Sequence, residues 1–248
     1  MGRVFLIASG KGGVGKTTVA SNLAAAFPKD KRVLVFDADL DLANLDIAFG
    51  MRDLHVYDLQ DLYFGRCSFS DAAIPVPDHP NVTAVFAPLR REASITVLLR
   101  FLREQVEACR ERYDYVLVDC PAGIGPALEV LSCPRYATVL VTTPDRTAVS
   151  DADRAAEHLY RKGAERIRLI VNRVRPQLIR KSRAPDIDDI IDTTAVQLIG
   201  LIPEDVSVIC AGNSDRLVLD MPRARSRKAF LNIARRLNGE DVDLDRFS

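Results

Sequence analysis

The chain has 248 residues, of which 48% are apolar and 27% are charged. This composition excludes wholesale disorder, a collagen-like fibre and a small disulfide scaffold. Lysine plus arginine total 34 and aspartate plus glutamate total 34, so the formal net charge is zero. A zero balance argues against a protein dedicated to coating nucleic acid. No apolar run approaches the roughly 18 residues that a membrane-spanning helix needs.

The cysteines indicate a reducing compartment. There are five of them, an odd number, at irregular spacings and without a C-x-x-C pair. Reduced thiols in a cytoplasmic protein are therefore expected, and the spacing predicts no cysteine-bound metal cluster.

Apolar strand-like runs alternate with helical patterns along the chain. Strands are expected at 3–8, 32–36, 82–87, 115–118, 138–142, 167–171 and 198–201, and helices at 16–27, 94–112, 150–162 and 227–237. Alternation of this kind predicts an α/β fold with a mostly parallel central sheet and helices on both faces. No repeat or linker divides the sequence, so one domain over residues 1–248 is expected. The least regular part, 50–91, holds four prolines and a short helical piece at 56–64, and long loops of this kind are often functional.

A phosphate-binding loop is the strongest motif. The run from Gly10 to Thr17 fits G-x-x-x-x-G-K-[ST] at every fixed position, and it follows the first strand and opens the first helix. Backbone N–H groups and the helix N-terminus suit phosphate oxygens, so a P-loop NTPase that binds Mg·ATP is predicted. The expected nucleotide-binding residues here are Gly10, Lys11, Gly12, Gly13, Val14, Gly15, Lys16, Thr17 and Thr18.

Two lysines of this loop have expected roles in catalysis. Lys16 should reach the β- and γ-phosphates. Lys11 is absent from the minimal motif and is either a solvated loop charge or a second cation that stabilises charge on the transferring phosphate.

Three aspartates follow apolar strands and predict a magnesium shell. Asp37 and Asp39 come after the second strand, and Asp119 ends the strand 115–118 as a Walker B carboxylate would. Carboxyl ends of parallel strands share one edge with the phosphate loop. The predicted metal ligands are Thr17, Asp37 and Asp119, with Asp39 available to orient an attacking water.

The sequence resembles the ParA/MinD family of deviant Walker A ATPases, a SIMIBI-type group of P-loop NTPases, and is most similar to its MinD branch. The resemblance covers nearly the whole chain. It rests on an ordered set of matches at 11–18, 39–46, 56–59, 65–67, 119–124, 148–154, 171–173, 186–189 and 202–205.

The resemblance implies a homodimer that sandwiches two nucleotides and hydrolyses ATP slowly. In the family, the residue at the position of Lys11 crosses to the partner's phosphates, the one at Asp39 orients the attacking water, and the one at Asn44 lies beside it. Asn172 is expected to read adenine, with Pro203 and Glu204 beside the base.

The resemblance also implies partners and a cellular role. A MinD-type switch in division-site placement recruits a MinC-type division inhibitor. It is activated by a partner, which is MinE-like or another topological factor. The alternative is an FlhG- or ParA-like positioning ATPase acting on flagella or DNA cargo, because the run 37–44 is also close to FlhG.

The sequence departs from the MinD pattern at two places. Gly125 stands where an acid is usual. The helix at 227–237 is expected to pack in the core, and 238–248 holds four acids and one base, the wrong sign for anionic lipid. We therefore expect weak or no membrane binding by this chain, with any attachment to the inner face of the membrane made through a partner.

Two further classes stay open at this stage. Residues 161–183 hold nine Lys/Arg and a single acid, Glu165, which is either a nucleic-acid footprint or a solvated face balanced by the acids at 186–192. The solvated face is favoured, so no specific nucleic acid is expected. A small-molecule kinase or a reductase-linked ATPase such as the nitrogenase iron protein shares the loop. The latter needs a cluster cysteine beyond Cys120, and none has the matching placement.

Overall fold

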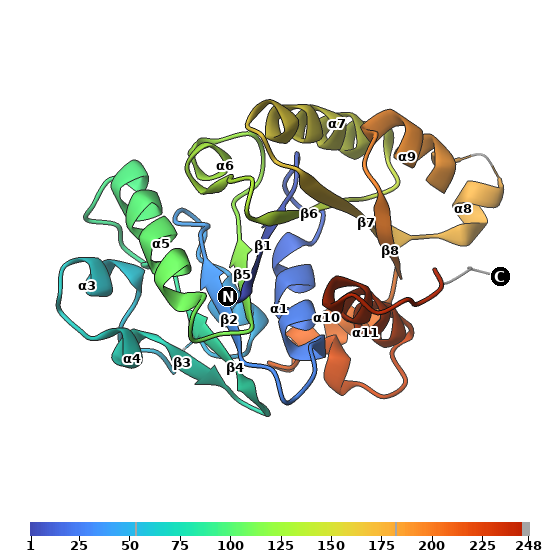
Figure 1. Cartoon of the computed structure of the whole chain (residues 1–248). Helices are drawn as coiled ribbons and strands as arrows, with labels where there is room; N and C mark the ends of the chain where they lie inside the picture. Colours follow the sequence, from blue (N-terminus) through green and yellow to red (C-terminus); the bar gives the residue numbers. More distant parts are fainter. Residues whose placement is uncertain (53, 182, 245–248) are drawn as a thin grey trace.

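The computed structural model describes residues 1–52, 54–181 and 183–244 and contains one eight-stranded sheet (Figure 1). The strand order is β3-β4-β2-β5-β1-β6-β7-β8, and all neighbouring pairs are parallel except β3 with β4. The strands are β1 (Arg3–Ala8), β2 (Val33–Asp37), β3 (Ile74–Val76), β4 (His79–Val85), β5 (Tyr115–Asp119), β6 (Ala137–Thr142), β7 (Arg166–Val174) and β8 (Leu198–Pro203). The predicted mostly parallel sheet is confirmed.

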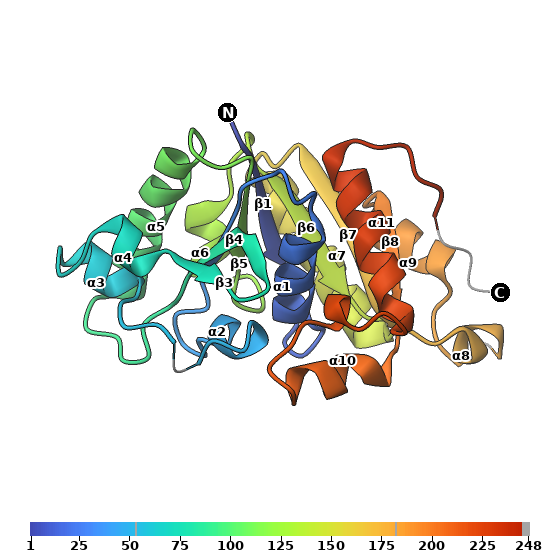
Figure 2. The same cartoon turned by 90° about the horizontal axis from the view of Figure 1, so that it is seen from below.

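Helices cover both faces of this sheet. They are α1 (Lys16–Ala26), α2 (Leu45–Ala48), α3 (Leu59–Tyr63), α4 (Phe69–Ala72), α5 (Ile95–Cys109), α6 (Pro126–Leu131), α7 (Arg146–Arg161), α8 (Pro176–Arg180), α9 (Ile187–Thr194), α10 (Val206–Gly212) and α11 (Arg225–Asn238). Helices α5, α6, α7 and α9 lie on one face, and α1 and α11 lie on the other (Figures 1 and 2). The two faces bury separate apolar clusters. Buried strands with both faces covered explain the nearly continuous apolar runs in the sequence.

The last helix belongs to the core, as its apolar stripe predicts. Phe230, Ile233 and Ala234 are at most 1% exposed. A Cβ on Gly200 of β8 would lie 2.2 Å from Cγ1 of Ile233, so the glycine lets the helix approach the strand closely. Of the acidic tail, residues 245–248 lie outside the described part of the chain.

The segment 50–91 is more regular than its composition predicts. It contains α3, α4 and an antiparallel hairpin of β3 and β4, which adds an edge strand to the sheet. Pro75 sits in this edge strand, where a missing N–H is tolerated. Asp78 takes a positive φ of 59° in the turn. The prolines of this segment therefore occur in an edge strand as well as in loops.

Different chain segments lie at the two ends of the strands. In Figure 2 the amino end of β1 and the last turn of α11 lie at the top, while the start of α1 lies at the bottom with α2 and α10. Among the described residues, no helix is long and apolar enough to cross a bilayer.

Candidate functional site

The phosphate loop joins β1 to α1 at the carboxyl edge of the sheet. Gly15 precedes the helix with φ 92°, a left-handed conformation that a side chain disfavours. Lys16 starts the helix and is 8% exposed. Because the first N–H groups of α1 have no partner within the helix, they and Lys16 can receive an anion at this end.

Asn172 supports the loop from β7. Its Nδ2 donates to the carbonyl of Val14 at 2.8 Å, and its Oδ1 accepts from the N–H of Arg173 at 2.9 Å. A Cβ on Gly15 would lie 2.4 Å from this Nδ2, so the side chain fills the space beside the loop. Asn172 thus lies at the predicted site, and its amide already holds the loop in shape.

A second close approach fixes the first part of the loop. A Cβ on Gly10 would lie 1.9 Å from the backbone carbonyl oxygen of Asp151 in α7. No side chain can fit there. Gly10 is therefore required by packing against α7 in addition to its place in the motif.

Asp37 and Asp119 form a buried carboxylate pair at the ends of β2 and β5. They are partners in the strand register, and each is 1% exposed. Burial and then the neighbouring Asp119 raise the pKa of Asp37 well above its ordinary value, although the N–H groups of Asp39 and Leu45 donate to it. Burial also raises the pKa of Asp119 to about 7 against the lowering effects of Thr17 and Lys16. Without a cation, this pair retains a proton near neutral pH.

The surroundings of Asp119 fit a divalent cation. Its Oδ1 is buried without a hydrogen-bond partner, while the Thr17 hydroxyl hydrogen-bonds to the carboxylate. Within the described residues no group of three His, Cys, Asp or Glu side chains could hold a metal alone. Mg²⁺ commonly takes one or two carboxylates, with water and substrate phosphates completing its shell. An acid pair, a hydroxyl and a phosphate loop match that requirement.

Asp39 and Asn44 lie on the segment after β2. Oδ1 of Asp39 accepts from the N–H of Leu42 at 3.2 Å. Asn44 precedes α2 and is exposed, with no side-chain cap hydrogen bond. Asp39 shares the sheet edge with the loop, and its charge contributes to the raised pKa of both Asp37 and Asp119.

Lys11 contacts α7 of its own chain. Its Nζ donates to Oγ1 of Thr147 at 2.7 Å and lies 3.8 Å from Oδ1 of Asp145, the N-cap of α7. The Lys11 side chain is 43% exposed. Asp145 and Thr147 thus lie beside the candidate site. The sequence motifs did not indicate them, because they lie more than 130 residues further along the chain.

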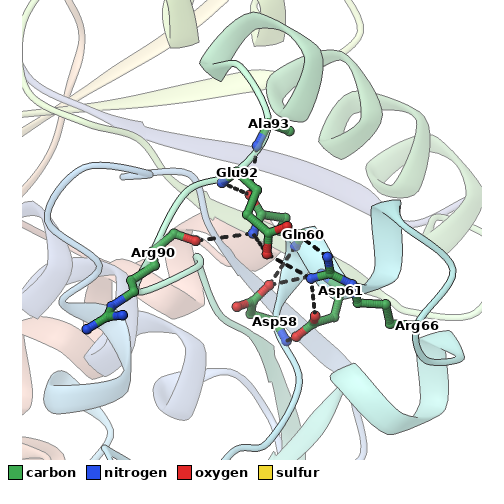
Figure 3. A network of polar contacts seen from close by, with 7 residues as sticks. All are labelled: Asp58, Gln60, Asp61, Arg66, Arg90, Glu92 and Ala93. Carbon is green, nitrogen blue, oxygen red and sulfur yellow. Dashed lines mark hydrogen bonds and ion pairs between the residues drawn. The ribbon is translucent and has the colours of Figure 1, made fainter.

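A polar network around Gln60 fixes the segment 90–93 (Figure 3). Gln60 of α3 is 3% exposed, and its Oε1 accepts from the N–H groups of Glu92 at 2.6 Å and Ala93 at 3.0 Å. Arg66 makes a bidentate pair with Glu92 at 2.8 and 2.9 Å.

The network bears on the site through Arg91. This residue lies next to Glu92, and its guanidinium pairs with Asp41 and also donates to the carbonyl of Leu40. The segment that carries Asp39 and Asn44 is therefore tied to the loop that Gln60 holds.

Pro203 and Glu204 lie away from the carboxylate pair, at the end of β8. Glu204 pairs with Arg175, and the pair lines a cavity of about 250 Å³ next to Arg173. We call it the β7–β8 pocket; its lining is Thr143, Pro144, Asp145, Arg173, Arg175, Leu178, Ala184 and Glu204. Asp145 belongs both to this pocket and to the surroundings of Lys11, so the pocket borders the phosphate loop.

Residues 5–218 match the family described as the CobQ/CobB/MinD/ParA nucleotide binding domain. The septum site-determining protein MinD of Synechocystis sp. is 36% identical over 98% of this chain and 91% of its own length.

Solved structures agree in fold over nearly the whole chain. The MinC:MinD cell division protein complex of Aquifex aeolicus superimposes with a TM-score of 0.89 at 30% identity, covering 99% of each chain. The MinD protein of Pyrococcus horikoshii complexed with Mg-ADP has a TM-score of 0.84 at 29% identity, covering 96% of each chain. The loop, the carboxylate pair and these matches over nearly full length agree, and the chain belongs to the MinD family of nucleotide-binding P-loop proteins.

Proposed function

We propose that this chain is a single-domain, MinD-like ATPase that binds Mg·ATP, dimerises on it and hydrolyses it slowly as a switch in division-site placement. The observation that carries the proposal is the buried Asp37–Asp119 pair beside a complete phosphate loop. Two carboxyls with raised pKa and an unpaired oxygen are costly unless a cation neutralises them. Mg²⁺ held by Thr17, Asp37 and Asp119 would supply charge neutralisation for the nucleotide phosphates.

The loop residues bind the phosphates in this proposal. The N–H groups from Gly10 to Thr18 surround the phosphates, and Lys16 carries the compensating charge. Asp39 accepts a hydrogen bond from the attacking water and so orients it toward the γ-phosphate, with Asn44 beside it. A single protomer should hydrolyse ATP slowly, because it lacks a cation beside the oxygen that leaves with ADP.

Lys11 supplies that cation from the partner protomer. Its contacts with Thr147 and Asp145 hold it against the start of its own α7, away from the phosphates in its own loop. Dimerisation exchanges these exposed contacts for a phosphate of the partner's nucleotide. Charge-assisted bonds to phosphate are stronger than an exposed lysine–threonine bond, which favours the exchange when ATP is present.

The β7–β8 pocket takes the base. Its position beside the loop and its lining by Glu204 and Arg175 support this assignment. Asn172 lies one residue before Arg173 and retains one amide N–H beyond its bond to Val14. The side chain can therefore hydrogen-bond to the loop and to the edge of an adenine at the same time.

The partners follow from the family. The Aquifex aeolicus relative is part of a complex with MinC, which supports a MinC-type division inhibitor as the partner of the ATP-bound dimer. A MinE-like or other topological factor would accelerate hydrolysis. The proposed place of action is the cytoplasm. FlhG- and ParA-like roles rank second, because the relatives described above carry the MinD name.

The test combines nucleotide state with partner binding. A MinC-type protein from the same cell is expected to co-elute with this chain in Mg·ATP and to separate in Mg·ADP. ATP hydrolysis should rise more steeply than linearly with protein concentration. Retention of nucleotide without any concentration dependence, together with binding of a flagellar or DNA-bound partner in place of the MinC-type protein, would support the alternative role.

A further inference from the structure

A second charged hollow lies at the amino edge of the sheet, the edge opposite the phosphate loop. The cavity measures about 440 Å³, within the range of small-molecule sites. Among the described residues, its lining holds six arginines and no aspartate or glutamate. We call it the arginine cradle; the six are Arg3, Arg110, Arg135, Arg166, Arg168 and Arg236.

The strand register brings these arginines together. Arg166 pairs with Ala137 in the β6–β7 ladder, and Ala137 pairs in turn with Phe5 of β1. Arg166 and Arg168 are two residues apart on one strand, so they point to the same face. Arg236 comes from the last turns of α11, which end at this edge (Figure 2). Five separate segments of the chain thus contribute cations to one hollow.

Neutral groups hold several of the guanidiniums in place. Arg3 donates to the carbonyl of Leu237 at 2.9 Å and Arg168 to that of Ile167 at 2.9 Å. Arg236 donates to the carbonyls of Ile199, Val242 and Asp243. Each guanidinium has five N–H donors, so Arg3 and Arg168 keep donors beyond their bond to one carbonyl. Backbone carbonyls orient the groups without cancelling their charge.

One carboxylate, that of Glu107, pairs with two members of the cradle. Glu107 contacts Arg110 at 3.0 Å and Arg135 at 3.3 Å. Other arginines of the chain have carboxylate partners outside the cradle, such as Arg66 with Glu92 and Arg235 with Glu240. Crowded like charges repel, so the cradle gains stability from an anion that enters it.

We propose that the arginine cradle is a binding site for a compact polyanion bearing several phosphate groups. Guanidinium forks match phosphate oxygens in pairs, and several guanidiniums around one hollow require more than one phosphate on the ligand. The same chemistry occurs in free polyphosphorylated molecules and in clustered lipid headgroups. Within the basic stretch 161–183, Arg166 and Arg168 belong to the cradle, while Arg180 and Arg183 border other cavities.

The first arm of the test uses a free ligand. Inositol hexakisphosphate is titrated calorimetrically into the full chain with Mg²⁺ in excess and Mg·ADP saturating, so that the phosphate loop is occupied. The double variant R135E/R166E is expected to weaken binding by roughly 100-fold, about tenfold for each charged donor removed. R135Q/R166Q serves as the milder variant, and unchanged ADP affinity reports an intact fold. R180E is the matched control from the same basic stretch and should stay within about twofold of the parent.

The second arm uses co-sedimentation with phosphatidylglycerol vesicles, against phosphatidylcholine vesicles as the neutral comparison. Binding of the hexakisphosphate that R135E/R166E loses and R180E keeps supports a free ligand. Pelleting with phosphatidylglycerol alone, with the same dependence on the variants, supports a lipid headgroup. Binding in neither arm, or an equal loss in R180E, overturns the proposal.

Discussion

Asp37 and Asp119 face each other across neighbouring strands, as partners in the β2–β5 register, with both carboxyls almost wholly buried. Burial and the proximity of the two carboxyls make their ionisation costly in the absence of a cation. Because Mg²⁺ would offset the free-energy cost of burying these two carboxyls, the stability of the nucleotide-free protein is linked to Mg²⁺ binding.

Stability of the nucleotide-free protein should fall as the pH rises. Burial raises the pKa of Asp119 to about 7 from 3.8. Between these values the folded chain holds a proton that the unfolded chain has released. This contribution is full below 3.8 and is lost as the pH passes about 7. Asp119→Asn stays neutral and should flatten this part of the curve. Urea unfolding between about pH 5 and pH 8 measures it. Asp78→Asn, an exposed turn variant, should leave the slope unchanged.

Binding of Mg·ADP should release a proton from the same pair. A protonated carboxyl must ionise before it can contact the cation, so affinity should tighten as the pH rises toward about 7. Calorimetry in two buffers of different ionisation enthalpy counts the protons. Asp119→Asn should remove the release and weaken the Mg²⁺ dependence of binding. Equal proton release by the parent and by Asp119→Asn would contradict the assignment.

Lys16→Ala should remove most nucleotide affinity. The lysine is 8% exposed at the first turn of α1, where its charge faces the expected phosphates. Loss of a charge-assisted contact of this kind predicts a decrease of roughly 100-fold in ADP affinity. Fluorescent-nucleotide titration is the measurement. Lys31→Ala, at the opposite edge of the sheet, is the control and should bind ADP as the parent does. Parental affinity and turnover in Lys16→Ala would contradict the predicted loop chemistry.

Lys11→Ala and Thr147→Val should act in opposite directions. The alanine variant should bind ADP normally but fail to dimerise with ATP, because the cation offered to the partner is gone. The valine variant keeps the cation and removes its local acceptor at 2.7 Å, which should favour the dimer by about 0.5 to 1 kcal/mol per protomer. Sedimentation velocity across a protein concentration series measures both effects. Equal dimerisation of the two variants would show that Lys11 has no role in trans.

Gln60→Ala should destabilise the fold near the site. The buried amide accepts from Glu92 and Ala93 and donates to the carbonyl of Arg90 at 3.2 Å. Losing these bonds in a buried position should lower the free energy of unfolding by about 3 kcal/mol. Chemical unfolding with exposed Gln177→Ala as control tests this, and the control should change stability by less than about 0.5 kcal/mol. An unchanged free energy of unfolding in Gln60→Ala would mean that water replaces the hydrogen bonds of the amide.

Local patterns predicted the parts of the fold that depend on local chemistry. The phosphate loop follows from glycine and lysine spacing, and the strand before Asp119 follows from one apolar run. Most of the expected strands and long helices agree with the structure within a few residues at each end. The short strand β3 was missed because Pro75 and Pro77 weaken its pattern, and its pairing with β4 depends on a turn at Asp78.

Contacts across the sheet could not be predicted from spacing alone. The bonds from Lys11 to Thr147 and from Asn172 to Val14 join residues more than 130 positions apart, and their geometry depends on strand order. The arginine cradle has the same origin. Its members are scattered from Arg3 to Arg236, and the register of β1, β6 and β7 together with the ends of α5 and α11 brings them together.

The proposed switch is an ATP-dependent dimer in which Asp39 orients the attacking water. Light scattering of Asp39→Ala with Mg·ATP and with Mg·ADP tests it most directly, because loss of water orientation leaves the lysines and the metal shell to hold ATP. We expect a stable dimer with Mg·ATP, a monomer with Mg·ADP and negligible turnover. A monomer with both nucleotides, or hydrolysis at the parent rate, would contradict it.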